Sequence, residues 1–103
     1  MGETNPTMIT CIVQRGEANK VIEAALKAGA EGATIFYGRG TGIREKIGFA
    51  GRFIQPEKEI ILIITKREQT DAVFDAVVNA AKLDKKGQGF AFLHTLDRAV
   101  GFL

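Results

Sequence analysis

The chain has 103 residues, of which 46% are hydrophobic and 25% are charged, and its formal net charge is +2. These are ordinary values for one globular domain, and so small a charge argues against a protein that coats polyanions over its whole surface. The single cysteine, Cys11, excludes an internal disulfide and fits a reducing compartment. No apolar run reaches the roughly 18 residues that span a bilayer, and the first residues lack the pattern of a signal peptide. We therefore expect one cytoplasmic domain over residues 1–103, with residues 1–7 flexible.

Several kinds of catalytic site are also excluded. The sequence contains no serine, one histidine (His94) and no cluster of cysteine and histidine residues. A serine triad is therefore impossible, and a zinc site of the usual spacing is unsupported. Cys11 and His94 both lie in apolar, strand-like runs, which favours a packed cysteine and a strand-end histidine over a thiol–imidazole pair. We predict that the protein is not an enzyme and holds no metal.

The first half of the chain has the pattern of a strand, a helix and a second strand. β-branched and apolar residues predict strands over Met8–Gln14 and Ala33–Gly38. Between them, apolar residues at helical spacing predict a helix that ends at Gly29, because glycine accepts the left-handed conformation at a helix end. The residues expected on its buried face are Ala18, Val21, Ile22, Ala25 and Leu26.

The second half repeats this order. Glu59–Thr65 is apolar nearly throughout and predicts a central strand, and a helix is expected over Arg67–Ala81. Thr65 and Glu68 are candidates for a capping box at the start of this helix. A glycine-containing turn then leads to a short strand at Phe90–His94. The helix residues expected to be buried are Val73, Phe74, Val77, Val78 and Ala81.

The order βαββαβ predicts an α+β fold of the ferredoxin-like class. This fold is a sandwich of a four-stranded antiparallel sheet with two helices on one face, and here a long loop over residues 39–58 would join its second and third strands. The other face of the sheet would be bare. Because alternate residues of Ile60–Ile64 are apolar on both sides, we expect that face to be buried against another subunit.

Two glycine-rich segments, Gly38–Ile43 and Asp84–Phe92, are candidates for binding an anion. Glycines let backbone N–H groups approach an anion closely, and nearby cationic residues add charge. Neither segment matches a standard nucleotide-binding motif. In a cyclic oligomer the two segments, which we expect in different parts of the sheet, could face each other across a crevice that suits a phosphorylated ligand. The cationic residues near it would be Arg39, Lys58, Lys85 and Lys86.

An RNA-binding alternative starts from Lys86–Leu93, which overlaps the RNA-recognition pattern at four positions. That motif needs aromatic residues facing RNA on the third and first strands. Here the segment precedes the last strand, Gln88 replaces one aromatic residue, and the first strand has none. We therefore predict no nucleic-acid partner.

Three segments together resemble the P-II signal-transduction family, over nearly the whole chain. They are "GATIFYGRGTG" (32–42), "QPEKEIILII" (55–64) and "KKGQGFAF" (85–92). The resemblance implies a homotrimer, an adenine nucleotide (ADP, AMP or ATP) in the clefts between subunits, and a flexible loop that docks onto a target protein. By the habit of the family, the target would be a membrane transporter or channel, without direct membrane insertion of this protein.

The resemblance also assigns residues to the two expected sites. Those that match nucleotide-binding positions of the family are Thr34, Gly40, Thr41, Gly42, Lys58, Gly87, Gln88 and Gly89. Those expected to contact the partner are Arg44, Lys46, Phe49, Arg52 and Phe53. The alternative is that Ile47, Phe49 and Phe53 pack the loop onto its own trimer. Valine at Gly87 or Gly89 is expected to abolish nucleotide binding and to leave the trimer intact.

Departures from the family pattern indicate a divergent branch rather than the nitrogen-regulating members. Phe90 stands where the family has a lysine, and Gly101 and Leu103 stand where it has arginines. Fewer cationic contacts predict a weaker dependence on the terminal phosphate, so that ADP or AMP become plausible beside ATP. The loop has no tyrosine, since Tyr37 lies in the strand, which argues against control by tyrosine modification. The alternative function is a CutA-type structural or metal-linked trimer without a nucleotide site.

Overall fold

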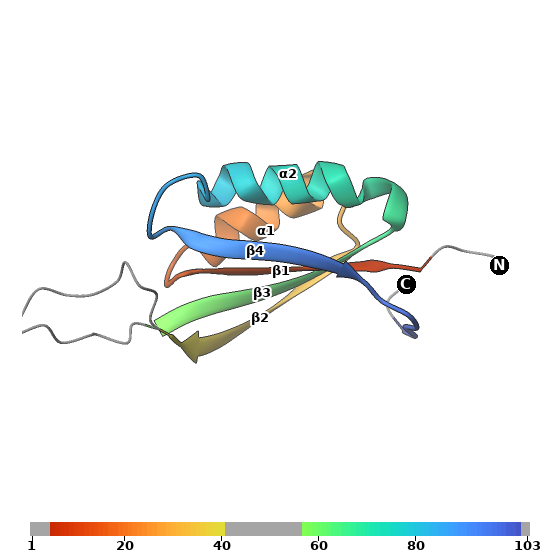
Figure 1. The fold of residues 1–103 in the computed structure, drawn as a ribbon, viewed down its shortest axis with the longest axis horizontal. Coiled ribbons are helices and arrows are strands. Elements are labelled where there is room, and N and C mark those ends of the chain that lie inside the picture. Colours follow the sequence, from red (N-terminus) through yellow and green to blue (C-terminus); the bar gives the residue numbers. More distant parts are fainter. Residues whose placement is uncertain (1–4, 41–56, 102–103) are drawn as a thin grey trace, which may run out of the picture.

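The computed structural model describes residues 5–40 and 57–101. Its elements follow the predicted order and are β1 (Thr7–Gln14), α1 (Ala18–Lys27), β2 (Gly32–Arg39), β3 (Glu57–Thr65), the 3-10 turn η2 (Arg67–Gln69), α2 (Thr70–Ala81) and β4 (Gly89–Thr95). The strands form one sheet in the order β2-β3-β1-β4, and every neighbouring pair is antiparallel. Both helices lie on one face of this sheet (Figure 1). The ferredoxin-like α+β fold is therefore confirmed.

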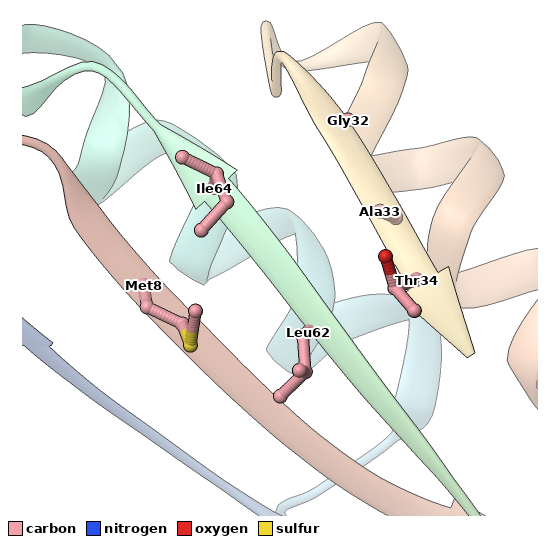
Figure 2. Close-up of a pocket in the computed structure, with 6 residues that line it drawn as sticks. All are labelled: Met8, Gly32, Ala33, Thr34, Leu62 and Ile64. Atoms are coloured by element: carbon pink, nitrogen blue, oxygen red, sulfur yellow. The ribbon is translucent and has the colours of Figure 1, made fainter. Parts of the chain in front are cut away.

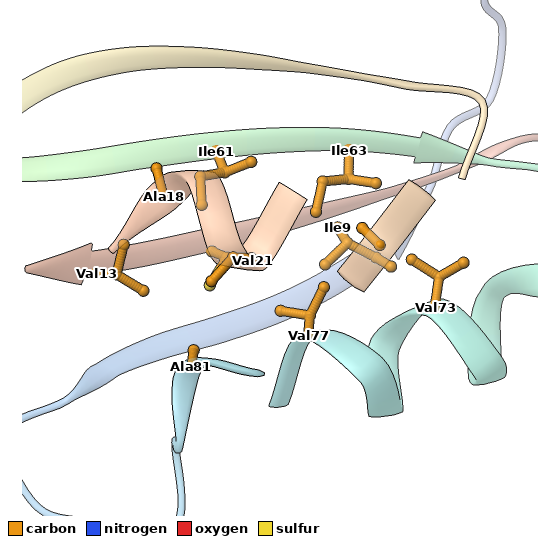
Figure 3. Packing of buried hydrophobic residues seen from close by; sticks show 11 residues of the cluster. Ile9, Val13, Ala18, Val21, Ile61, Ile63, Val73, Val77 and Ala81 are labelled. Atoms are coloured by element: carbon orange, nitrogen blue, oxygen red, sulfur yellow. The ribbon is translucent and has the colours of Figure 1, made fainter. Parts of the chain in front are cut away.

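The core lies between the sheet and the two helices. Alternate residues of the two central strands face the helices, so that Ile9 of β1 pairs with Ile63 of β3 and Cys11 pairs with Ile61, and Val13 lies on the same face (Figure 3). The helices contribute small or β-branched side chains, which allow close approach to the sheet. The fully enclosed apolar residues are Ile9, Cys11, Val13, Ala18, Val21, Ala25, Ile61, Ile63, Val73, Val77 and Ala81.

The helices differ from their predicted pattern at a few positions. Leu26 was expected to be buried but is 49% exposed, because α1 packs through Ala18, Val21 and Ala25. Gly29 ends the helix as predicted, with a φ of +116°. The predicted capping box is wrong. The Thr65 hydroxyl, at the end of β3, hydrogen-bonds the Thr70 hydroxyl at 2.8 Å, and no side chain caps η2 or α2.

The sheet face away from the helices, called here the open face, is apolar. Ile60, Leu62 and Ile64 of β3 point to this face and are only half-buried, which matches the expectation that β3 is apolar on both sides. Phe36 and Phe90 of the outer strands are 47% and 60% exposed on the same face. The apolar residues of the open face are Met8, Ile12, Phe36, Ile60, Leu62, Ile64, Phe90 and Phe92.

Both glycine-rich segments meet the sheet at the same end, which we call the loop end. In the register of the strands, Lys58 of β3 lies between Gln14 of β1 and Gly38 of β2, and Gly89 of β4 pairs with Val13 one residue away. The segments therefore approach one end of the sheet at its two opposite edges (Figure 1). β2 and β3 also reach farther toward this end than predicted, through the pair Arg39 and Glu57. The connection outside the strands is correspondingly shorter than residues 39–58.

Candidate functional site

The turn between α2 and β4 begins with a tight helix end. Lys82 adopts the left-handed conformation with a φ of +55°, and the N–H of Leu83 donates to the carbonyl of Val78 at 3.1 Å. This hydrogen bond from Leu83 to Val78 is that of a Schellman motif, which satisfies carbonyl groups that the last turn of a helix leaves unpaired. Leu83 packs against the core and fixes the position of the turn. The chain then passes through Lys85 and Lys86, both exposed, to the loop end of the sheet.

The two glycines of this turn have different structural roles. Gly89 has a φ of +152°, and a Cβ built there would lie 2.4 Å from the carbonyl oxygen of Ile12. Only glycine fits at this position, so valine there would collide with the backbone of β1. That Gly89→Val leaves the trimer intact stays a prediction. Gly87 has a φ of +79° but open space around it. A side chain at Gly87 would therefore strain the backbone without a collision.

The turn presents backbone N–H groups that the described residues do not use. Lys85 donates to the carbonyl of Lys82 at 3.0 Å, and Gln88 donates to that of Lys85 at 3.4 Å. Over residues 5–40 and 57–101, the N–H groups of Lys86 and Gly87 donate no hydrogen bond. Two adjacent N–H groups next to two exposed lysines are a combination that suits an anion.

Gln14 connects this turn to the central strands. Its side-chain Nε2 donates to the carbonyl oxygen of Gly87 at 2.9 Å, and its Oε1 accepts from the Nζ of Lys58 at 3.1 Å. Lys58 is 8% exposed, although it carries a charge. The amide of Gln14 thus lies between a residue of β3 and the glycine turn, which are 29 residues apart in the chain, and holds both at the loop end.

The next residue of β3, Glu59, points to the other face of the sheet. It is 8% exposed, and its Oε1 accepts a 2.8 Å hydrogen bond from the backbone N–H of Ala18. α1 has no cap from its own sequence, because Glu17 precedes it without a side-chain hydrogen bond to the helix. The beginning of β3 is therefore attached to the glycine turn through Lys58 and to α1 through Glu59.

Gly40 lies just beyond the end of β2 at the loop end. A Cβ built there would meet nothing within 4 Å, and its φ lies outside the left-handed range. The fold of the described residues therefore does not demand glycine at this position. Nearby, Glu57 pairs with the Arg15 guanidinium at 3.0 Å, and both side chains are more than half exposed. This ion pair contributes little to stability but places charge at the rim of the loop end.

Thr34 lies in a groove on the open face, with a volume of about 240 Å³ (Figure 2). Its register partner is Leu62, four residues along β3 from Lys58, and β2 is the edge strand opposite β4. Within one chain the structure therefore does not bring Thr34 to the glycine turn. The groove is lined by Met8, Gly32, Ala33, Thr34, Leu62 and Ile64.

Other predicted site residues have less structural context. Gln88 is half-buried in the turn, and Phe90, which replaces the expected lysine, points to the open face with its ring centroid 5.5 Å from that of Phe92. Gly101 has a φ of +91° with open space around it. The remaining predicted residues lie outside the described ranges; they are Thr41, Gly42, Arg44, Lys46, Phe49, Arg52, Phe53 and Leu103.

Cys11 and His94 are on opposite faces of the sheet, as expected for residues that do not act together. Cys11 faces the helices and is fully buried, which raises the pKa of its thiol to about 11. His94 lies on the open face beside Phe92. Within the described ranges, no three histidine, cysteine or acidic side chains gather in a way that could hold a metal ion. Neither described helix has the length and apolar character that a bilayer crossing needs.

Gln14 and Glu59 were missed by the sequence analysis. Each is a polar residue at the loop end of a strand that is otherwise apolar, and this position is the only signal that could have found them. Their partners come from 41 or more residues away in the chain. No local pattern could therefore identify their hydrogen bonds.

Comparison with known proteins supports one family. The structure is similar to the crystal structure of a Bacillus cereus protein related to NIF3, with a TM-score of 0.72 over 95% of this chain. The match covers 27% of that protein at 19% identity, so this likeness shows the fold alone. No curated protein matches the chain in sequence. The sequence model of nitrogen regulatory protein P-II matches residues 6–101, and the chain therefore belongs to the P-II family.

Proposed function

We propose that the protein is a non-catalytic regulator that senses an adenine nucleotide and controls a partner protein. The observation that carries this proposal is the glycine turn, where two unused backbone N–H groups, of Lys86 and Gly87, lie beside Lys85 and Lys86. Such a surface binds phosphate groups without any catalytic side chain. Membership in the P-II family, a family of signal-transduction regulators, supports the regulatory role.

The site is proposed to lie between subunits of a homotrimer. The apolar open face supports self-association, because eight apolar side chains in one contiguous face are costly to leave in water. Thr34 and the glycine turn belong to opposite edges of the sheet. We therefore propose that the nucleotide spans two subunits, with Thr34 from one and Gly87, Gln88 and Gly89 from the next.

The ligand is proposed to be ADP, AMP or ATP. We expect the preference for ATP over ADP and AMP to be weaker than in relatives that carry a lysine after the turn. Phe90 offers an apolar ring there. Lys58 and Lys86 supply charge at the loop end, with Gly40 and the predicted residues Thr41 and Gly42 on the other wall of the cleft. The change in occupancy would be passed to the loop between β2 and β3 and to its predicted contact residues Arg44, Lys46, Phe49, Arg52 and Phe53.

The partner is proposed to be a membrane transporter or another target protein on the cytoplasmic side of a membrane. The arrangement that supports a switch is the attachment of β3 at its first residues, where Lys58 bonds to Gln14 of β1 and Glu59 bonds to Ala18 of α1. A ligand that moves Lys58 would change how the loop leaves the sheet, which is how a binding event can select among loop conformations.

Calorimetric titration of the trimer with ATP, ADP and AMP tests this function. Binding of at least one nucleotide below millimolar concentration is expected, together with a rise in melting temperature, because a ligand at 100 times its Kd adds about 2.7 kcal/mol to stability. Absence of binding by all three would overturn the nucleotide-sensor proposal and favour the CutA-type trimer. The mass of the assembly, measured by light scattering at the same concentrations, tests the trimer separately.

A further inference from the structure

We propose that Gln14 is the positioning residue of the ligand site, because it fixes the glycine turn and Lys58 relative to each other. The inference rests on the proposed nucleotide site and adds to it the residue that couples its two halves. Gln14 was assigned no role by the sequence, and it stands at the last position of β1, between β3 and the turn before β4.

The chemistry of the amide explains why glutamine suits this position. A primary amide carries one acceptor oxygen and one donor nitrogen on the same carbon. The Lys58 ammonium can only donate and the Gly87 carbonyl can only accept, so one orientation of the Gln14 amide serves both, at 3.1 Å and 2.9 Å. Neither a carboxylate nor an ammonium at this position could satisfy both partners.

The two contacts set the positions of the Gly87 carbonyl and the Lys58 ammonium, and both groups matter for a bound anion. A carbonyl oxygen that faced the ligand would repel phosphate, and the hydrogen bond from Gln14 holds the oxygen of Gly87 toward the sheet instead. Lys58 is 8% exposed and needs its charge balanced or hydrogen-bonded in place. Gln14 accepts from the Lys58 ammonium and so holds it in a defined position at the loop end.

Two substitutions separate positioning from packing. Gln14→Glu keeps an acceptor for Lys58, adds a negative charge beside it and sets a carboxylate oxygen against the carbonyl of Gly87. Gln14→Met has a similar length and makes neither hydrogen bond. In titrations of the trimer with ADP we expect both variants to bind at least tenfold more weakly than wild type, with Gln14→Glu the weaker of the two.

A double-mutant cycle shows whether Gln14 acts through Lys58. If it does, Gln14→Met combined with Lys58→Met should weaken ADP binding no more than the worse single variant. The matched reference cycle combines Gln14→Met with Thr34→Ala, where the two effects should add because Thr34 lies at the opposite edge of the sheet. If the role of Gln14 is purely structural, the effects on ADP affinity should combine in the same way in both cycles. Asn5→Asp, the same charge change at an exposed residue just before β1, controls for net charge and should bind ADP as wild type does.

The outcomes separate this inference from the proposed function. If wild type fails to bind ADP, ATP or AMP, the proposed function fails and the inference with it. If wild type binds ADP but both Gln14 variants bind equally well, the positioning role is overturned and the nucleotide site stands. Additive effects in the cycle with Lys58→Met would overturn the coupling. Melting curves without nucleotide identify any variant that has lost its fold. If Gln14→Glu is unfolded, the comparison with wild type uses Gln14→Met.

Discussion

The Oε1 atom of Glu59 accepts a 2.8 Å hydrogen bond from the backbone N–H of Ala18, so a strand residue caps a helix that begins 41 residues earlier. Helix N-terminal N–H groups have no partner within the helix, and a negative charge there also interacts favourably with the helix dipole. Because Glu59 is the third residue of β3, this contact joins the start of α1 to the point where the chain returns to the sheet.

Removal of this cap should destabilise the fold. Glu59→Ala is expected to lower the free energy of unfolding by about 1–2 kcal/mol, because a helix cap and a buried acceptor are lost together. The measurement is thermal unfolding by circular dichroism. Glu57→Ala is the matched control, since Glu57 lies in the same strand but forms only an exposed ion pair, and its effect should stay within about 0.5 kcal/mol. Equal losses in the two variants would contradict the capping role.

The fold was predictable because its signals are periodic and local. Runs of β-branched and apolar residues in the strands and the helical spacing of apolar residues in α1 and α2 predicted every element within a few residues. The two glycine-rich segments and the apolar open face were also identified from the sequence. β2 and β3 were predicted too short because Arg39 and Glu57 are polar, and pairing across the two strands decides their ends rather than hydropathy.

The parts of the site that could not be predicted depend on contacts between distant segments. The hydrogen bonds of Gln14 follow from the register of β1 with β3 and β4, which no pattern within one strand gives. Leu26 is exposed although it lies at helical spacing, because α1 packs through Ala18, Val21 and Ala25. The structural demand for glycine at position 89 comes from the carbonyl of Ile12, which the sequence cannot place.

Alanine at Gly40 and at Gly89 should have different effects on stability. Gly40→Ala is expected to leave stability within about 0.5 kcal/mol of wild type, because its Cβ would meet open space, and to weaken ADP binding if that space belongs to the nucleotide. Gly89→Ala should cost about 2 kcal/mol or more, because its Cβ would collide with the carbonyl of Ile12. Melting curves and calorimetry on both variants test this. Unchanged ADP affinity in Gly40→Ala would remove Gly40 from the site.

Phe90→Lys should restore preference for longer phosphate chains. Phe90 is 60% exposed in the single chain, so a lysine fits the fold of the chain, and its ammonium would stand beside the glycine turn. Because Phe90 also belongs to the apolar open face, the assembly has to be checked in this variant. We expect the affinity for ATP to rise about tenfold relative to AMP, the size of one charge-assisted contact. Phe90→Met is the uncharged control, and light scattering verifies that the assembly is retained. An equal gain for both nucleotides would show that Phe90 does not set the preference.

The buried thiol predicts a loss of stability in alkaline solution. Burial raises the pKa of Cys11 from 9.0 to about 11, so the unfolded chain releases this proton at lower pH than the folded protein. Its contribution is therefore complete below pH 9 and is lost as the pH rises from about 9 to 11, by up to about 2–3 kcal/mol. Chemical denaturation across this range measures the loss. Cys11→Ala should lack this part of the decline, and the same slope in both proteins would exclude the thiol as its cause.

β3 has apolar residues on both of its faces, and only one of them is covered by the helices of its own chain. Burial of the second face, and the stabilisation that it brings, requires another molecule. If copies of the protein cover it for one another, the midpoint of unfolding becomes a function of protein concentration through mass action. Dilution would then lower the stability of the protein, and its concentration in the cell would decide whether it stays assembled and folded.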